Sequence, residues 1–259
     1  MPRRLPAARL LALPLALAAC ATASGPARGP APAAPPSPAA LVAALDRSPE
    51  DRALDAGRHP AELLEFLEVR PGQRVAELGA ADGYTAELLA RAVGRDGAVY
   101  AQNSRSLLSF VGDAWVRRLA GPAMRPVIRV DREFEDPLPP QATGLALVVM
   151  NAIYHDTIWL AVDRDRMNRA VFQALAPGGV YVVIDSSARP GAGPDASYEL
   201  HRVDEALVRR EVEAAGFRLS GEGYFLRNPA DERDWNAAPN EAGERRGTSD
   251  RFALRFVRP

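Results

Sequence analysis

Hydrophobic and polar positions follow two different periods along the chain from Leu41 onward. Short apolar runs such as 74–78 and 145–150 are typical of buried strands, whereas apolar residues three and four positions apart in 84–93 are typical of a helix. Proline and glycine separate these segments. The pattern predicts helical segments within 41–68 and at 84–93, 107–119, 163–175 and 204–215, and strands at 74–78, 97–102, 125–130, 145–150, 180–185, 217–226 and 252–257.

Strands that alternate with helices favour a parallel sheet with right-handed crossovers and a ligand site at the carboxyl ends of the strands. The last two predicted strands have no helix between them, so we expect one of them to run antiparallel. The sequence therefore predicts an α/β fold with a Rossmann-like, doubly wound sheet of about seven strands. The C-terminal strand of this sheet is expected to be antiparallel.

Residues 1–20 have the features of a bacterial export signal. Arg3 and Arg4 precede an apolar stretch, 10–19, that is shorter than the roughly 20 residues needed to span a bilayer. The segment Leu17-Ala-Ala-Cys20 ends in the single cysteine of the chain and resembles the lipobox of bacterial lipoproteins. This resemblance implies lipidation at Cys20. The alternatives are an ordinary signal peptide cleaved near residues 21–24 or a chance apolar N-terminus.

Residues 21–40 consist mostly of alanine, proline, glycine and serine, a composition typical of a flexible spacer. We therefore expect a linker at 21–40 and a folded domain at 41–259. Ala21, rather than an acidic residue, follows Cys20, which by the same resemblance favours the outer membrane. The predicted location is the periplasmic side of a bacterial membrane, with the membrane contacted through the lipid anchor.

Charge and composition exclude several kinds of function. The 32 basic and 33 acidic residues argue against a nucleic-acid partner held by bulk electrostatics. The chain has no lysine for Schiff-base or P-loop chemistry, and one cysteine forms neither an intrachain disulfide nor a CxxC site. Nothing in the spacing of His155, Asp156, Asp185 and His201 requires a metal, so we expect none.

The segment 75–84 places glycines where a predicted strand turns into a helix. Glycines there let the backbone approach a ligand, and the helix start offers free N–H groups, although a tight turn without a ligand has the same composition. Glu77-x-Gly79-x-Ala81-x-Gly83 resembles motif I of S-adenosylmethionine-dependent methyltransferases, in which an acid precedes Gly-x-Gly-x-Gly. The segments 70–79, 82–85, 99–103, 175–179 and 250–252 resemble a family of bacterial methyltransferases, some of which carry export signals.

This resemblance covers roughly residues 45–259 and implies the class I methyltransferase fold with S-adenosylmethionine as cofactor. Ala81 replaces the middle glycine of motif I, and the usual acid at the end of the second strand is absent. Gln102 or Asn103 would meet the ribose hydroxyls there, with weaker hydrogen bonds than a carboxylate makes. The implied cofactor-binding residues are Glu77, near the methionine amino group, and Gly79, Ala81, Asp82, Gly83, Tyr84, Gln102, Asn103 and Asp131.

Candidate catalytic residues follow the fourth and fifth predicted strands. Methyl transfer is an in-line displacement that depends mostly on positioning, sometimes with a base. His155 is a candidate base because its ordinary pKa lies near neutrality, but His155-Asp156 is equally consistent with a helix cap. The predicted catalytic set is Asn151, Tyr154, His155, Asp156 and Asp185.

Residues 229–249 form a polar stretch too long for a hairpin turn, which predicts either a mobile lid or disorder. Trp235 within it would cover a substrate or anchor the loop.

The predicted strand order, together with the resemblance to methyltransferases, implies a methyltransferase for an unknown small molecule or envelope component. The alternative is a non-catalytic periplasmic ligand-binding module on the same scaffold, because S-adenosylmethionine is made in the cytosol. A hydrolase using Asp185 and His201 is less favoured, since no Gly-x-Ser-x-Gly occurs.

Overall fold

A computed structural model describes residues 1–2 and 35–259 of the chain. Cys20 and most of the predicted signal and linker segments lie outside the described residues, so lipidation and export stay predictions. The first helix, α1 (Pro38–Val42), begins inside the predicted linker and is capped by the Ser37 hydroxyl. Among the described residues, no helix has the length and apolar character needed to cross a bilayer.

A seven-stranded sheet forms the centre of the domain, with strand order β3-β2-β1-β4-β5-β7-β6. β7 runs antiparallel to both of its neighbours, and the remaining pairs are parallel, which confirms the predicted fold class. The strands are β1 (Arg74–Leu78), β2 (Ala98–Asn103), β3 (Val127–Asp131), β4 (Leu145–Asn151), β5 (Leu175–Ser186), β6 (Arg218–Gly223) and β7 (Arg251–Val257).

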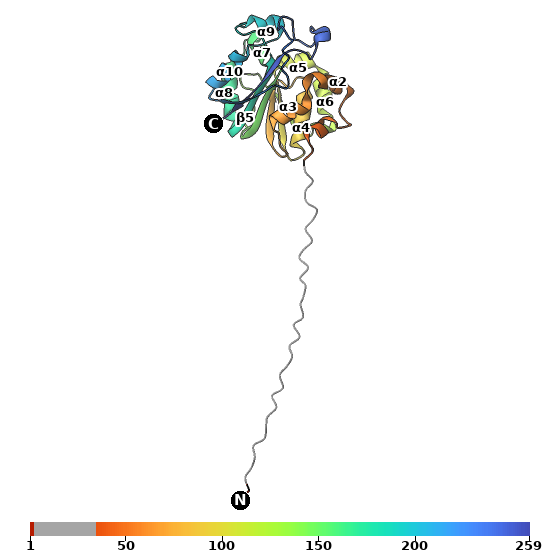
Figure 1. Ribbon diagram of the computed structural model, residues 1–259, viewed down its shortest axis with the longest axis vertical. Helices are drawn as coiled ribbons and strands as arrows, with labels where there is room; N and C mark the ends of the chain where they lie inside the picture. Colours follow the sequence, from red (N-terminus) through yellow and green to blue (C-terminus); the bar gives the residue numbers. More distant parts are fainter. Residues whose placement is uncertain (3–34) are drawn as a thin grey trace. The chain divides into compact units, whose positions relative to one another are not determined.

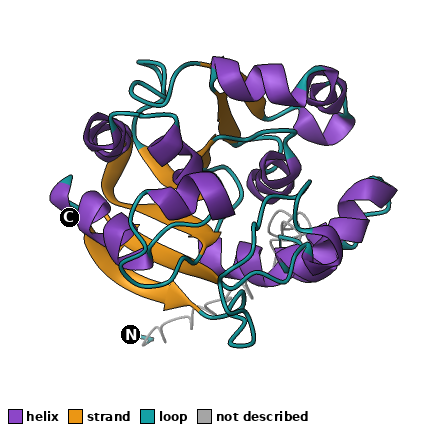
Figure 2. Cartoon of the chain, turned by 90° about the horizontal axis from the view of Figure 1, so that it is seen from above, coloured by secondary structure: helices purple, strands orange, loops and turns teal. Residues whose placement is uncertain are grey.

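Helices cover both faces of this sheet. Figure 1 shows α3 and α4 on one side of the strands and α8 and α10 on the other, and Figure 2 shows the strands between helices in a second view. Beyond α1, the described helices are α2 (Pro49–Arg58), α3 (Pro60–Leu67), α4 (Tyr84–Val93), α5 (Arg105–Val111), α6 (Asp113–Leu119), η1 (Pro122–Met124), α7 (Tyr154–Trp159), α8 (Arg164–Ala174), α9 (Asp195–Leu200), α10 (Glu205–Ala214) and η2 (Gly243–Arg245).

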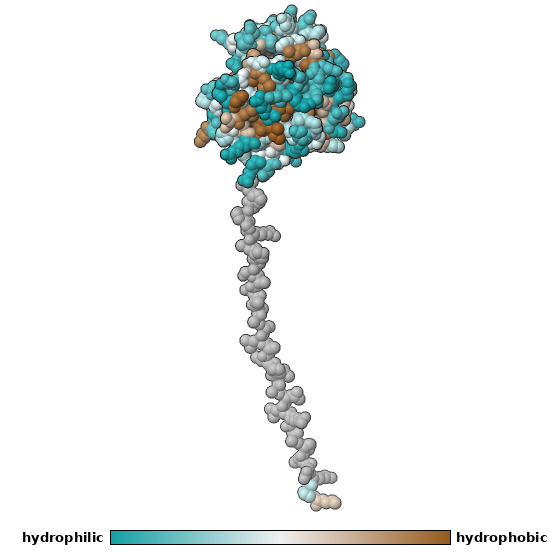
Figure 3. All heavy atoms as spheres, turned by 180° about the vertical axis from the view of Figure 1, so that it is seen from behind, coloured by the Kyte–Doolittle hydropathy of each residue, from teal (hydrophilic) through white to brown (hydrophobic). Residues whose placement is uncertain are grey.

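The core consists of separate apolar clusters on the two faces of the sheet. In β4, Val148 and Met150 pack toward the cluster that holds Met167 of α8, whereas Leu147 and Val149 belong to the opposite cluster. From Leu147 to Met150, alternation at period two therefore places successive side chains against opposite helical layers, which explains the uninterrupted apolar run in the sequence. Figure 3 shows hydrophobic residues in patches among hydrophilic ones on one face of the surface.

The structure differs from the predicted elements in three places. The predicted helix 107–119 is two helices, because Gly112 at φ 51° and ψ −133° interrupts it. Helix α7, which begins at Tyr154 shortly after β4 ends at Asn151, was not among the predicted helices. Helix α9, which His201 caps at its C-terminal end in a left-handed conformation, was not among the predicted helices either.

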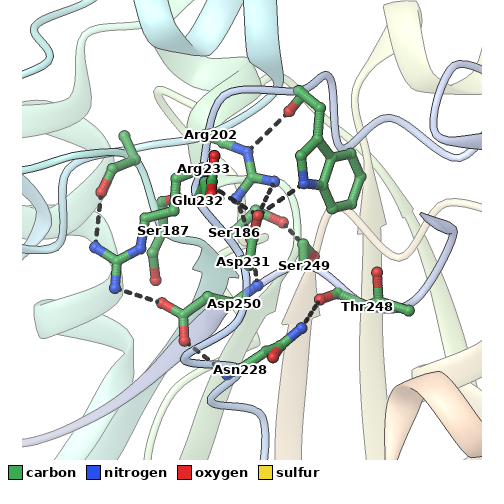
Figure 4. A network of polar contacts seen from close by, with 12 residues as sticks. Ser186, Ser187, Arg202, Asn228, Asp231, Glu232, Arg233, Thr248, Ser249 and Asp250 are labelled. Atoms are coloured by element: carbon green, nitrogen blue, oxygen red, sulfur yellow. Dashed lines mark hydrogen bonds and ion pairs between the residues drawn. The ribbon is translucent and has the colours of Figure 1, made fainter.

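The segment 229–249 is held on the domain by a polar network. The buried side chains of Arg202 and Asp231 form an ion pair at 2.8 Å, and the Trp235 indole donates to Asp231 at 2.7 Å (Figure 4). Asp231 also accepts a hydrogen bond from the backbone N–H of Asp250 at 2.7 Å, which ties the segment to the start of β7. The predicted disorder is therefore wrong, and Trp235 anchors the segment by stacking on the Arg202 guanidinium, 4.7 Å from the ring centroid.

Candidate active site

The strand order reverses between β1 and β4, so the carboxyl ends of these strands form the switch point where doubly wound folds bind ligands. The loop after β1, residues 79–83, and helix α7 after β4 flank this point. A cavity of about 430 Å³ lies beside it, after β2 and β3. Its lining comprises Ser104, Arg105, Ser106, Ser109, Glu133, Phe134, Glu135, Leu160 and Val162.

The loop after β1 contains three residues with positive φ: Gly79 at 67°, Ala81 at 50° and Gly83 at 89°. Alanine is strained in this region by roughly 1–2 kcal/mol, so its conformation needs support. Asn103 supplies it, because its side chain accepts a hydrogen bond from the Ala81 N–H at 2.8 Å and donates one to the Ala81 carbonyl at 3.0 Å. Ala81 thus adopts the left-handed backbone conformation that a glycine would adopt at this position, and Asn103 at the end of β2 stabilises it.

Gln102 at the end of β2 also stabilises the loop after β1. Its side-chain oxygen accepts from the Gly79 N–H at 2.9 Å, and its side-chain nitrogen donates to the Arg132 carbonyl at 2.6 Å. Gln102 and Asn103 are fully buried and both of their amides are occupied by backbone groups. The structure therefore shows both residues supporting the loop, and their contact with the ribose stays a prediction.

Two glycines of the loop are required by neighbouring side chains. A Cβ atom on Gly79 would lie 2.8 Å from Ile153, and one on Gly83 would lie 2.6 Å from Trp115 of α6. Asp82, between them, contributes its carbonyl to Arg118 at 2.5 Å. The glycine spacing thus serves close packing of the loop as well as the predicted path of a cofactor.

Glu77, at the end of β1, is a buried carboxyl group with an uncommitted oxygen. Burial raises its pKa to about 8, although a hydrogen bond from Thr85 acts in the opposite direction. Its Oε2 atom has no hydrogen-bond partner in the described part of the chain. Asn151, at the end of β4, donates to the Thr85 hydroxyl at 3.3 Å and so links β4 to the start of α4.

Arg58, at the end of α2, is a site residue that the sequence did not indicate. Its guanidinium lies over the Tyr84 ring, 4.2 Å from the centroid, and forms no hydrogen bond or ion pair with another described residue. Burial lowers its pKa, while Asp82 acts in the opposite direction. The Tyr84 hydroxyl donates a hydrogen bond to Asp55 at 2.7 Å, which fixes the ring on which the Arg58 guanidinium lies.

Buried charges hold helix α2 against the loop. Arg118 of α6 forms ion pairs with Asp51 of α2 at 2.6 Å and with Glu87 of α4 at 2.8 Å. A single guanidinium therefore joins three helices and also the Asp82 carbonyl. These partners are far apart in sequence, which is why no local motif indicated them.

Beyond β4 and β5, the structure brings His155 and Asp185 together. Nδ1 of His155 lies 2.8 Å from Oδ1 of Asp185, and Oδ2 accepts the His155 backbone N–H at 2.9 Å. On the other side, Nε2 of His155 lies 3.1 Å from Oδ1 of Asp156. Burial lowers the pKa of His155, but the two carboxylates outweigh it and raise the pKa to about 10. His155 is therefore protonated at neutral pH, which does not favour its predicted role as a base.

The remaining predicted site residues lie elsewhere. Tyr154 is fully buried and donates its hydroxyl to Glu211 of α10 at 2.7 Å, so it belongs to the helical core. Asp131 pairs with Arg129 on its own strand at 2.8 Å and does not line the cavity. Among the described residues, Asp185 hydrogen-bonds to His155 and forms no hydrogen bond with His201, so the pair that the less favoured hydrolase reading requires is not formed.

Comparison with known proteins identifies the family. The family model of protein-L-isoaspartate(D-aspartate) O-methyltransferase matches residues 50–186, a little over half of the chain, from α2 to the end of β5. No curated protein matches the chain.

Solved structures share the fold at low sequence identity. A SAM-dependent methyltransferase from Aquifex aeolicus has a TM-score of 0.56 at 16% identity, over 84% of this chain and 97% of that one. Aeropyrum pernix fibrillarin, solved with natively bound S-adenosyl-L-methionine, has a TM-score of 0.52 at 14% identity, over 79% and 76%. The [4+2]-cyclase SpnF has a TM-score of 0.54 at 16% identity, over 81% and 80%. The chain belongs to the protein-L-isoaspartate(D-aspartate) O-methyltransferase family and is an S-adenosylmethionine-dependent methyltransferase.

Proposed function

We propose that the chain transfers a methyl group from S-adenosylmethionine to a carboxylate of a small molecule or envelope component. The observation that carries this proposal is a pair of complementary groups beside the loop after β1. Among the described residues, Oε2 of Glu77 has no hydrogen-bond partner and the guanidinium of Arg58 has no hydrogen bond or ion pair. The methionine part of the cofactor has an ammonium and a carboxylate. The charge of the ammonium would favour the ionised form of Glu77, which would accept from it, and Arg58 would hold the carboxylate, each through charge-assisted hydrogen bonds.

The cavity after β2 and β3 is suited to the adenosine part. Phe134 and Leu160 provide apolar walls, and Glu133 and Glu135 provide carboxylates. A carboxylate from the β3 side would replace the acid that β2 lacks as the acceptor for the ribose hydroxyls. Gln102 and Asn103 then act indirectly, by fixing the backbone of the loop on which the cofactor lies.

The proposed acceptor class rests on the family and on one further cation. The family name describes O-methylation at an aspartate carboxyl group. Arg251, at the start of β7, has a buried Nε that lacks a partner in the described part of the chain, and its terminal nitrogen donates to the Gly57 carbonyl beside Arg58. Burial lowers its pKa to about 10, so it stays cationic at neutral pH and is suited to hold an acceptor carboxylate. A carboxylate nucleophile is already ionised at that pH and needs no general base. When bound, the cofactor supplies the electrophilic methyl group.

Calorimetric titration of the full chain with two ligands tests the cofactor site. S-adenosylhomocysteine has the amino-acid group, whereas 5′-methylthioadenosine lacks it. We expect Glu77→Gln and Arg58→Gln each to weaken S-adenosylhomocysteine binding by about tenfold, the loss of roughly one charge-assisted hydrogen bond. Binding of 5′-methylthioadenosine should stay within about twofold, and the exposed Arg95→Gln serves as control. Equal losses for both ligands, or no binding of either at about millimolar concentration, would refute the assignment.

We also propose that Cys20 is lipidated and anchors the domain on the periplasmic side of a membrane, with the outer membrane favoured. The apolar stretch before Cys20 and its position as the single cysteine support this. Metabolic labelling with an alkyne fatty acid, compared between the natural chain and Cys20→Ser, tests the anchor. Labelling that persists in Cys20→Ser would contradict it.

A further inference from the structure

Two histidines and an aspartate from different elements converge beyond the ends of β4 and β5. His155 and Asp156 belong to α7, and His201 ends α9. One ligand atom from each of the three side chains lies within 4.8 Å of the other two. The two imidazole rings are edge to face, with centroids 5.4 Å apart. We propose that this trio binds one divalent transition-metal ion, a site outside the groups assigned above to methyl transfer.

Asp185 positions His155 as a metal ligand. Its carboxylate is completely buried and accepts hydrogen bonds from Nδ1 of His155, from the His155 backbone and from the Ser186 backbone. The ring orientation is therefore fixed, and Nε2 is the nitrogen that faces Asp156. A carboxylate that holds the far nitrogen of a histidine is the usual outer-shell arrangement around protein-bound metals, and it raises the basicity of the coordinating nitrogen.

The other two side chains have uncommitted atoms. Oδ1 of Asp156 accepts from the Trp159 indole at 2.8 Å, whereas Oδ2 accepts no hydrogen bond from any described residue. Nδ1 of His201 is buried and lacks a partner within the described part of the chain. Without an ion, the protonated Nε2 of His155 donates to Oδ1 of Asp156 at 3.1 Å, and a bound ion would take the place of that proton between the two atoms.

Two nitrogens and one oxygen define the class of ion. Imidazole with carboxylate is suited to Zn²⁺, Fe²⁺ or a similar first-row ion, whereas Mg²⁺ and Ca²⁺ prefer oxygen ligands alone. Three protein ligands leave coordination positions open, as in catalytic rather than structural sites. Water or an oxygen of a substrate would fill them. The ion would also tie α7 to the turn after α9, so it should stabilise the folded domain.

Zn²⁺ titration of the full, untagged chain after chelator treatment tests the site, with a chromogenic chelator as competitor. All samples carry Cys20→Ser so that the single thiol contributes no ligand. We expect one Zn²⁺ per chain with micromolar or tighter affinity, and no competition by Mg²⁺. His201→Ala and Asp156→Asn should each weaken Zn²⁺ binding by at least about tenfold. The matched control is His59→Ala, because His59 is the remaining histidine and is surface-exposed.

His201 and Asp156 are only partly buried, so their variants should fold, which circular dichroism verifies. Zn²⁺ should also raise the Tm of the natural trio and leave that of His201→Ala unchanged. No binding at about millimolar Zn²⁺, or equal binding by the His201→Ala and His59→Ala chains, would overturn the proposal. S-adenosylhomocysteine binding, measured on the same samples, reports separately on the methyl-transfer site.

Discussion

Asn103→Ala tests whether strand β2 holds the loop after β1 in its ligand-binding conformation. The substitution removes both side-chain hydrogen bonds to Ala81, at 2.8 and 3.0 Å. Each is worth about 1 kcal/mol net, and more where the backbone partner stays unsatisfied. Ala81 then keeps its left-handed strain of roughly 1–2 kcal/mol without support, or the loop relaxes. We expect the free energy of unfolding to fall by about 2–4 kcal/mol.

Urea unfolding followed by circular dichroism measures this loss, and calorimetry with S-adenosylhomocysteine measures its consequence for binding. Asn240→Ala is the matched control, because Asn240 is exposed and donates only to Glu241; it should change stability by less than about 0.5 kcal/mol. A similarly small change for Asn103→Ala would refute the bracing of Ala81. A large loss of stability with unchanged affinity would show that the loop is not part of the cofactor site.

Three further predictions concern charge and packing. In the folded chain Glu77 keeps its proton to about pH 8, whereas in the unfolded chain it loses the proton near pH 4.5. The free energy of unfolding should therefore fall as the pH rises through this window. Urea unfolding at several pH values should show a smaller decline for Glu77→Gln. Asp231→Asn should lower the free energy of unfolding by about 3 kcal/mol, because the buried Arg202 loses its counter-ion. The loosened segment should also expose Arg233 to trypsin, and an unchanged cleavage pattern would contradict this. Gly83→Ala should lower the unfolding free energy by about 2–4 kcal/mol through positive φ and overlap with α6; full stability in urea would refute the packing constraint.

Local patterns predicted the sheet, but not the side-chain contacts at the carboxyl ends of its strands. The helix 84–93 and the strand 74–78 were predicted with their observed bounds, because their periodicity and their flanking glycines act within a few residues. Asp185 and His155 were expected at the same edge because carboxyl ends of parallel strands converge there. Arg58 was not, since its place over Tyr84 depends on how α2 packs against α4.

The two departures from the family pattern, Ala81 in place of the motif I glycine and the absence of the acid at the end of β2, depend on each other. Where the motif has glycine, Ala81 needs outside support to hold its left-handed backbone, and the residue that provides it, Asn103, ends the strand on which the usual acid is missing. A carboxylate at that position has no donor for the Ala81 carbonyl, whereas an amide bonds to both backbone groups. The two substitutions therefore belong together, because the amide stabilises the alanine loop. Under the proposed function, Glu133 or Glu135 in the cavity after β3 would accept from the ribose hydroxyls.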